Sequence, residues 1–275
     1  MKKKVLAVLK AAGVIIILFI ALFPLTWMVI TSCKSMTELL RIPPTILPEN
    51  MTMTSYYEVW VQKPFPRYIW NSLKISFVAT VVGMTVSSLA AYGFAKFRFP
   101  FKKGLLMFVL VAQMFPGTSV IIPLFSTYKS YGLYDSHIGL MMLYATISLA
   151  FSIWMMYGYF RSVPSELEEA ARIDGCGALK SFIHVILPIS KPGIAAVGVY
   201  AFMCSWNEYL YSQILLTSEK NYTISRGLSS FITEFGTYWN QMGAAAIIVT
   251  LPTLLIFILL GKNLIAGLTA GAVKG

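Results

Sequence analysis

Six long apolar runs divide this sequence, and they restrict the possible folds more than any other feature. Each has about 20 residues, and a helix of that length rises about 30 Å, the thickness of the hydrocarbon core of a bilayer. Inside a bilayer, every backbone N–H and C=O must be paired within the protein, and a helix does this by itself. The sequence therefore predicts an all-α polytopic membrane protein with six transmembrane helices, at residues 11–32, 71–95, 104–126, 138–160, 192–213 and 243–261.

The distribution of charge predicts how these helices are oriented. Only 12% of the 275 residues are charged, whereas about 25% are charged in ordinary soluble domains. Of the 22 Lys and Arg residues behind the net charge of +11, fourteen fall in residues 1–10, 96–103, 161–191 and 262–275. Cytoplasmic loops are enriched in Lys and Arg. The basic balance is therefore interpreted as a topology signal with both termini in the cytoplasm, and nucleic acid is not expected as a partner.

The N-terminal run resembles a signal peptide but is longer than one. Its apolar part of about 20 residues exceeds the usual 7–15 of a signal peptide, so a retained first helix is predicted. The three cysteines would lie outside, inside and within the membrane, so no disulfide is expected. No repeat is visible, and residues 1–275 are interpreted as a single transmembrane domain.

An acidic segment interrupts this apolar chain at 161–191, between the fourth and fifth runs. Ser165 and Glu168 have the spacing of a capping box, which predicts the start of a helix. Gly175 and Gly177 predict a sharp turn that ends this helix, because glycine adopts left-handed backbone conformations at no steric cost. The bland alternative is a surface linker whose charges merely face water. The four acids, among only eleven in the protein, are Glu166, Glu168, Glu169 and Asp174.

This segment also resembles a known signature. Glu169-Ala170-Ala171, then three residues, Gly175, nine residues and VILP at 185–188 resemble the EAA signature of the permease subunits of ATP-binding-cassette importers. Val185 departs mildly from that signature, which most often has Ile there. In that family, of the type I importer fold, the segment is the coupling helix that inserts into a cleft on a partner ATPase. The resemblance implies ATPase docking by Glu168, Glu169, Ala170, Ala171, Asp174 and Gly175.

Other stretches resemble the carbohydrate-uptake subgroup, typified by the G-type permease subunit of the maltose transporter. They are WNEYL at 206–210, NSL at 71–73 and the ending GLTAGAVKG at 267–275. The resemblance implies that the tail residues Gly271, Lys274 and Gly275 contact the ATPase. It also implies a multi-pass protein of a bacterial inner or plasma membrane that imports a sugar or oligosaccharide by alternating access.

The resemblance implies partners as well: a second homologous permease subunit, two ATPase subunits, an extracellular solute-binding protein, the carbohydrate and membrane lipid. The chain has no G-x-x-x-x-G-K-[ST] phosphate loop, so ATP and Mg are expected in the partner ATPase and no cofactor in this chain. With two histidines and no His/Cys cluster, neither a metal site nor a catalytic site is expected. The chain is therefore not expected to be an enzyme.

Polar residues in the fifth run are candidates for the substrate pathway or the permease interface: Asn207, Glu208 and Tyr209. A carboxylate in the bilayer normally faces water or a partner. The structural alternative is that Glu208 simply reaches the outer membrane interface. An alternative function is a proton-coupled secondary transporter that uses Glu208, although such proteins usually have carboxylates in several spans. A membrane-embedded transferase, a third class, would need clustered carboxylates or histidines at the membrane surface.

The third outer loop, 217–243, is too long for a simple turn. Aromatics at its end suit either the membrane interface or a protein contact. By position the loop resembles the family's segment that enters the binding protein, which implies contact through Phe235, Tyr238, Trp239 and Asn240.

Overall fold

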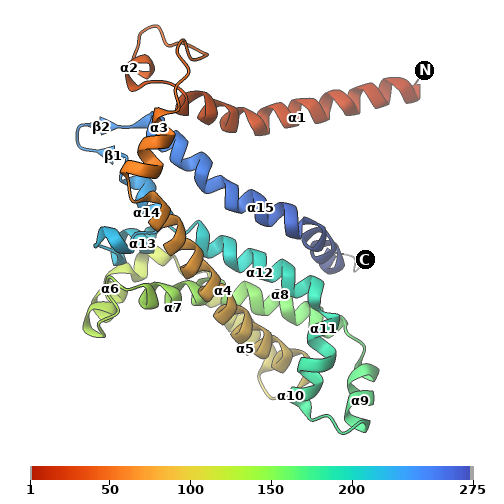
Figure 1. Cartoon of the computed structure of the whole chain (residues 1–275). Coiled ribbons are helices and arrows are strands. Elements are labelled where there is room, and N and C mark those ends of the chain that lie inside the picture. The colour runs from red at the N-terminus through yellow and green to blue at the C-terminus, as the bar shows by residue number, and fades with distance from the viewer. Residues whose placement is uncertain (1, 273–275) are drawn as a thin grey trace. The chain divides into compact units, whose positions relative to one another are not determined.

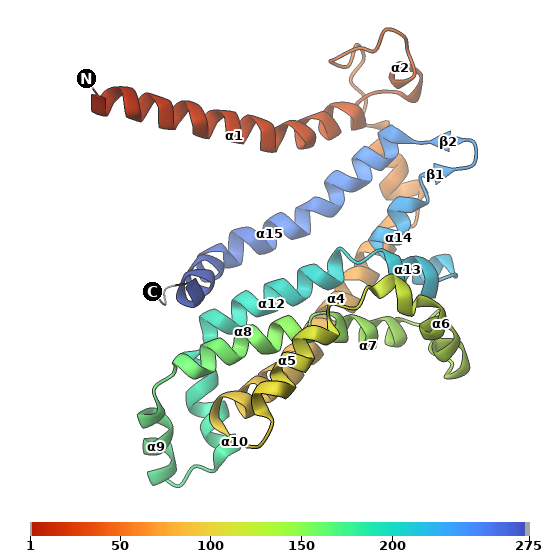
Figure 2. The same ribbon diagram turned by 180° about the vertical axis from the view of Figure 1, so that it is seen from behind.

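The computed structural model describes the backbone of residues 2–272 and the side chains of Leu6, residues 9–259 and Gly261. Apart from one short hairpin, the regular structure in this part of the chain is helical (Figures 1 and 2), as the sequence predicts. The chain forms two compact units. The first contains the chain up to Arg67 together with Gly227–Pro252, and the second contains Tyr68–Arg226 and the chain from Thr253 onward.

The first unit is built on the contact between α1 (Lys2–Ser32) and the start of α15 (Trp239–Ala272). A Cβ atom added at Gly243 would lie 3.3 Å from the Met28 carbonyl oxygen, so this glycine lets the two helices approach closely. The other elements of the unit are α2 (Met36–Leu39), α3 (Thr54–Tyr57), a π-helical turn (Glu58–Gln62), β1 (Ile232–Thr233) and β2 (Gly236–Thr237). The two strands pair antiparallel.

The second unit holds the remaining helices. Its long helix α4 (Phe65–Lys96) contributes to both of its buried clusters. In the same unit, α8 (Leu149–Ser162) packs alongside α12 (Lys191–Trp206). The rest are α5 (Lys102–Ala112), a 3₁₀ turn (Gly117–Val120), α6 (Ile121–Ser130), α7 (His137–Ile147), α9 (Ser165–Ile173), α10 (Ala178–Ser181), a π-helical turn (Phe182–Ile186), α11 (Leu187–Ile189), α13 (Leu210–Leu215), a 3₁₀ turn (Glu219–Asn221) and α14 (Ile224–Ser229).

Two buried clusters stabilise the second unit, and α4 contributes to both. Near its end, the Tyr92 ring lies 4.7 Å from the Phe182 ring, which lies 5.7 Å from Phe160, measured between centroids. Near its start, Ile75 packs with Tyr144 and neighbouring apolar side chains. Because one continuous helix joins the clusters, α4 fixes the positions of the helices that pack against it.

Three of the six predicted transmembrane helices lie within single continuous helices. In the described residues, Leu9–Ser32, Phe65–Lys96 and Trp239–Leu259 are single helices long and apolar enough to cross a bilayer. The runs 104–126 and 138–160 are bent by 84° and 46°. The bend in 104–126 falls near Pro116, whose extended backbone precedes a 3₁₀ turn. Counting each bent pair as one span gives up to six spans, which confirms the polytopic all-α fold.

The prediction of one continuous helix at residues 192–213 is wrong. α12 ends at Trp206, and three residues separate it from the short α13. Its first residues continue, after a bend of 84°, from the helical segment Ala178–Ile189. At 1.5 Å per residue, α12 alone is about 24 Å long, shorter than a typical hydrocarbon core.

Candidate functional site

The acidic segment forms a separate short helix, α9, at the end of the second unit (Figures 1 and 2). It follows α8 and precedes α10, so the helix–turn–helix expected from the sequence is present. Its acids are divided between two environments. Glu166, Glu169 and Asp174 are exposed, whereas Glu168 is only 5% exposed. Three carboxylates therefore face solvent and one faces the protein.

Glu168 joins α9 to the end of α4. Its Oε1 accepts a hydrogen bond from Tyr92 Oη at 2.8 Å, and its Oε2 lies 3.7 Å from Lys96 Nζ. Arg172, one turn further along α9, reaches Oε1 at 3.3 Å. Lys96 also donates to the Val163 carbonyl oxygen at 3.1 Å, just before α9 begins. Since the Tyr92 ring packs in the core cluster, this network ties α9 to the buried core of the unit.

The predicted capping box is wrong. Ser165 is the first residue of α9 rather than its N-cap. The N-cap position is occupied by Pro164, and no side-chain hydrogen bond caps this end of the helix. The Glu168 side chain has stronger partners than a backbone N–H, because Lys96 is a cation and the site is buried. The assignment of Glu168 to a docking surface also meets a physical obstacle, because its carboxylate points inward.

The predicted glycine turn is confirmed at Gly175. This residue has φ of +83°, the left-handed conformation. Gly175 N donates to Arg172 O at 3.0 Å, and Cys176 N donates to Ala171 O at 2.9 Å. These two bonds form the Schellman motif, which satisfies carbonyl groups at a helix end. Gly177 has φ of −67° and needs no glycine-specific conformation, which corrects the expectation for that residue.

The outward surface of α9 combines charge with one apolar side chain. Ala170 and Leu167 are exposed, but Ala171 is 7% exposed and packs inward, so the two alanines do not lie on the same surface. Ile173, which sequence reasoning missed, is 87% exposed at the end of the helix. Exposed apolar side chains ringed by charge are typical of protein contacts. Chemically, the surface offers carboxylates for positively charged groups and an apolar side chain for contact.

Asn207, Glu208 and Tyr209 lie in the break between α12 and α13. Glu208 Oε1 accepts a hydrogen bond from Tyr211 N at 2.8 Å, and its Oε2 accepts from Ser212 N at 3.1 Å and from Tyr144 Oη. The carboxylate therefore satisfies free N–H groups at the start of α13, where the helix dipole favours negative charge. Asn207 and Tyr209 are exposed, and Glu208 is half-buried.

Sequence reasoning also missed Asp135, which joins the loop before α7 to the loop after α13. Its carboxylate accepts hydrogen bonds from Thr217 N at 2.9 Å, from Ser218 N at 3.0 Å and from Ser218 Oγ. Burial raises the pKa of Asp135, but these hydrogen bonds outweigh it and hold the pKa below its ordinary value. An isolated Asp in a loop gave no sequence signal for such a role.

The predicted contact residues of the third outer loop lie around the β-hairpin and the start of α15. Phe235, at the tip between β1 and β2, is 99% exposed. Tyr238 and Trp239 are 46% and 51% exposed, whereas Asn240 is 9% exposed and turned inward. The hairpin therefore presents one fully exposed aromatic side chain at its tip, and two half-exposed rings follow it in the chain.

The predicted tail contacts cannot be placed. Gly271 lies in the last turn of α15, where only the backbone is described, and Lys274 and Gly275 lie outside the described residues. Among the described residues, no group of three or more His, Cys, Asp or Glu side chains could hold a metal ion.

The chain resembles proteins of known type along almost its whole length. Residues 83–269 match the family described as "Binding-protein-dependent transport system inner membrane component". An inner membrane ABC transporter permease protein, YcjP of Escherichia coli, is 34% identical over 96% of this chain and 95% of its own length. The trehalose/maltose transport system permease protein MalG of Thermococcus litoralis is 31% identical, with 100% of both chains covered.

Solved structures share the fold. A chain of a bacterial ABC transporter involved in the import of the acidic polysaccharide alginate has a TM-score of 0.81. It is 22% identical, and the match covers 95% of this chain and 97% of that one.

Proposed function

The chain belongs to the family of binding-protein-dependent transport system inner membrane components, and from this premise we propose that an ATPase partner drives it through the outward surface of α9. The family and its sugar-transporting members identify the chain as a permease subunit of an ATP-driven, binding-protein-dependent carbohydrate importer. Family membership also removes the alternative of a proton-coupled secondary transporter. Glu208 has an explanation without proton transfer, since it caps α13.

The observation that supports docking is the division of acids on α9. Glu166, Glu169 and Asp174 face outward beside the exposed Ile173, while Glu168 holds the helix to Lys96 and Tyr92. A partner with basic residues around an apolar pocket complements this surface. Because α9 is anchored to α4, a push on α9 is transmitted to the helices of the second unit.

The orientation follows from the positions of the basic residues. We place both termini and α9 on the cytoplasmic side of a bacterial inner or plasma membrane, because the segments on that side carry most of the Lys and Arg. The ATPase then meets α9 in the cytoplasm, where ATP and Mg²⁺ bind to the ATPase and not to this chain.

The complete importer contains three further kinds of protein: a homologous permease subunit, two copies of the ATPase and an external solute-binding protein. We assign the contact with the binding protein to the hairpin, because Phe235 is fully exposed at its tip and the half-exposed Tyr238 and Trp239 follow it closely in the chain. Aromatic side chains are enriched in such interfaces.

The docking proposal is tested by reversing charge on α9. Glu169→Lys is expected to abolish copurification of the ATPase and sugar uptake, with the permease still present in the membrane. Lys129→Glu, a charge reversal of the same size and opposite sign at an exposed position on α6, serves as the control and is expected to change neither. Normal copurification and uptake with Glu169→Lys would show that α9 is only a linker.

A further inference from the structure

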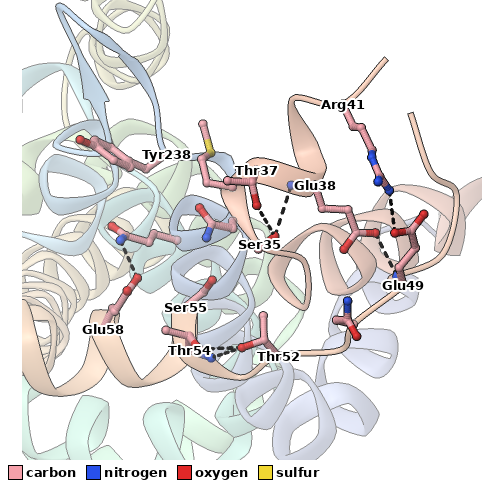
Figure 3. A pocket seen from close by; sticks show the side chains of 14 residues that line it. Ser35, Thr37, Glu38, Arg41, Glu49, Thr52, Thr54, Ser55, Glu58 and Tyr238 are labelled. Atoms are coloured by element: carbon pink, nitrogen blue, oxygen red, sulfur yellow. Dashed lines mark hydrogen bonds and ion pairs between the residues drawn. The ribbon is translucent and has the colours of Figure 1, made fainter. Parts of the chain in front are cut away.

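A polar cavity lies within the first unit, between the segment from Ser35 to Glu58 and the start of α15 (Figure 3). Its volume is about 660 Å³. Cavities of about 300–1,000 Å³ are the usual size for small-molecule sites. The lining contains five Ser or Thr hydroxyls, three side-chain amides, three carboxylates, one guanidinium and the ring of Tyr238.

Two buried polar atoms in this lining have no hydrogen-bond partner in the described structure. Ser55, at 1% exposure, has an unpaired Oγ, and Asn240, at 9% exposure, has an unpaired Oδ1. An unsatisfied buried polar atom costs about 1–3 kcal/mol, so native proteins rarely keep one without a partner. These two atoms come from segments far apart in the sequence, α3 and α15, and both line the same cavity.

The other polar groups are largely paired with each other. Glu38 Oε1 accepts from Thr45 Oγ1 at 2.7 Å and from Glu49 N at 3.0 Å. Arg41 pairs with Glu49 at 2.6 Å, and Glu58 accepts from Gln241 at 2.7 Å. Their mutual pairing holds the cavity walls in place. Ser55 Oγ and Asn240 Oδ1 remain unpaired and are the atoms to which a ligand could hydrogen-bond.

The charge and hydrogen-bond character of the lining restrict the ligand. Hydrogen bonds from Thr45 and from the Glu49 backbone lower the pKa of Glu38, so this carboxylate is ionised at neutral pH. Three carboxylates against one guanidinium repel an anion. Asn240 Oδ1 and the carboxylates are acceptors, so the ligand must supply hydrogen-bond donors. The half-exposed ring of Tyr238 adds an apolar face (Figure 3).

We propose that this cavity is a binding site for one or two rings of a neutral saccharide, which donates hydroxyl hydrogens to Asn240 Oδ1 and hydrogen-bonds Ser55 Oγ while a ring packs against Tyr238. The site extends the carbohydrate-import function and rests on it. Tyr238 and Asn240, which line the cavity, closely follow in the chain the hairpin that is assigned to the binding protein. The site therefore gives this subunit its own contact with the substrate.

The test measures sugar binding to the assembled importer in lipid nanodiscs, without the binding protein. Saturation-transfer NMR is recorded with maltose, trehalose and N,N′-diacetylchitobiose, and with galacturonate as an anionic probe. We expect saturable binding of at least one neutral sugar and none of galacturonate. Asn240→Leu is expected to weaken that binding about 3- to 10-fold, the effect of losing one or two neutral hydrogen bonds.

Two further measurements separate a ligand site from a structural one. Asn240→Leu removes an unsatisfied acceptor, so the unliganded importer is expected to melt at the same temperature or higher. Thr54→Trp, which fills the cavity from an exposed lining position, is expected to abolish binding, whereas Thr127→Trp on α6 leaves it unchanged.

The outcomes also separate this proposal from the importer function. Sugar uptake by cells with the wild-type importer tests the function alone, and its absence with every sugar contradicts carbohydrate import. Uptake together with no neutral-sugar binding, or with binding unaffected by Asn240→Leu and Thr54→Trp, overturns the site and means that the cavity holds only water. Preference for galacturonate contradicts the charge argument and overturns the proposal as well.

Discussion

Glu168 and Glu169 are neighbours in the chain, but their carboxylates have different surroundings and different roles. Glu168 is buried beside Tyr92 and Lys96, and Glu169 is exposed. A buried ion pair stabilises a structure only while both partners are present, because removing one leaves an uncompensated charge. At the scale of single residues, positioning and docking are therefore separate functions of adjacent side chains.

Glu168→Ala is expected to destabilise the protein by about 3 kcal/mol, because Lys96 then remains buried without its partner. The loss is measured as a lower melting temperature of the importer in detergent. Glu166→Ala, at an exposed position of the same helix, is the control and should change stability by less than about 0.5 kcal/mol. The double variant with Lys96→Met should recover much of the loss, and additive losses in the double variant would show that the two groups are not coupled.

Asp135 gives an expected pH dependence. Because hydrogen bonds from Ser218 and Thr217 hold its pKa below the ordinary value of 3.8, it adds stability that is complete above about that pH. This stability is lost as the pH falls through the lower pKa of the folded state. The stabilities of wild type and Asp135→Asn should therefore differ by a constant amount well above pH 3.8 and converge as the pH falls through the lower pKa of the folded state. A difference that grows with acid would contradict this assignment.

At the scale of elements, helix breaks place functional groups where a continuous helix would not. The gap after α12 lets Glu208 cap α13 and leaves Asn207 and Tyr209 exposed. The left-handed Gly175 ends α9 before it runs on into α10. The hairpin between α14 and α15 carries Phe235 at its tip. Each of these positions is set by the end of an element rather than by its interior.

The hairpin tip can be changed without removing the hairpin. Replacing Glu234-Phe235 with Asn-Gly keeps a two-residue turn favourable for a hairpin. We expect the importer to assemble and to hydrolyse ATP at its basal rate, while stimulation by the sugar-loaded binding protein and sugar uptake both fall several-fold. Phe235→Tyr keeps the aromatic ring and is expected to retain stimulation. Full stimulation by the Asn-Gly variant would exclude a contact through the tip.

At the scale of the whole molecule, function depends on which groups lie on which side of the membrane. The docking helix α9 and the basic segment 96–103 are assigned to one side, and the hairpin, the saccharide cavity and the loops tied by Asp135 are assigned to the other. An importer needs this separation, because sugar arrives outside and ATP is hydrolysed inside.

Single cysteines test the orientation in a background without Cys33, Cys176 and Cys204. Cysteines at Lys103 and Ser165 should be shielded from an impermeant thiol reagent in intact cells, and one at Lys220 should react; all three positions are exposed on the protein. All three should react in permeabilised membranes, which controls for local burial. Labelling of Ser165 in intact cells would reverse the orientation and remove the docking proposal.

The sequence by itself determined the class of fold, the number of apolar runs, the acidic helix and its end at Gly175. Hydrophobicity over about 20 residues and glycine at a left-handed position are local properties, so they can be predicted without knowing what packs nearby. Only the tertiary structure decided that Glu168 turns inward, that Glu208 caps a helix and that Ser55 and Asn240 share a cavity. These roles depend on partners distant in sequence, such as Lys96 for Glu168 and Tyr144 for Glu208. The burial and charge that those partners supply exist only once the chain has folded.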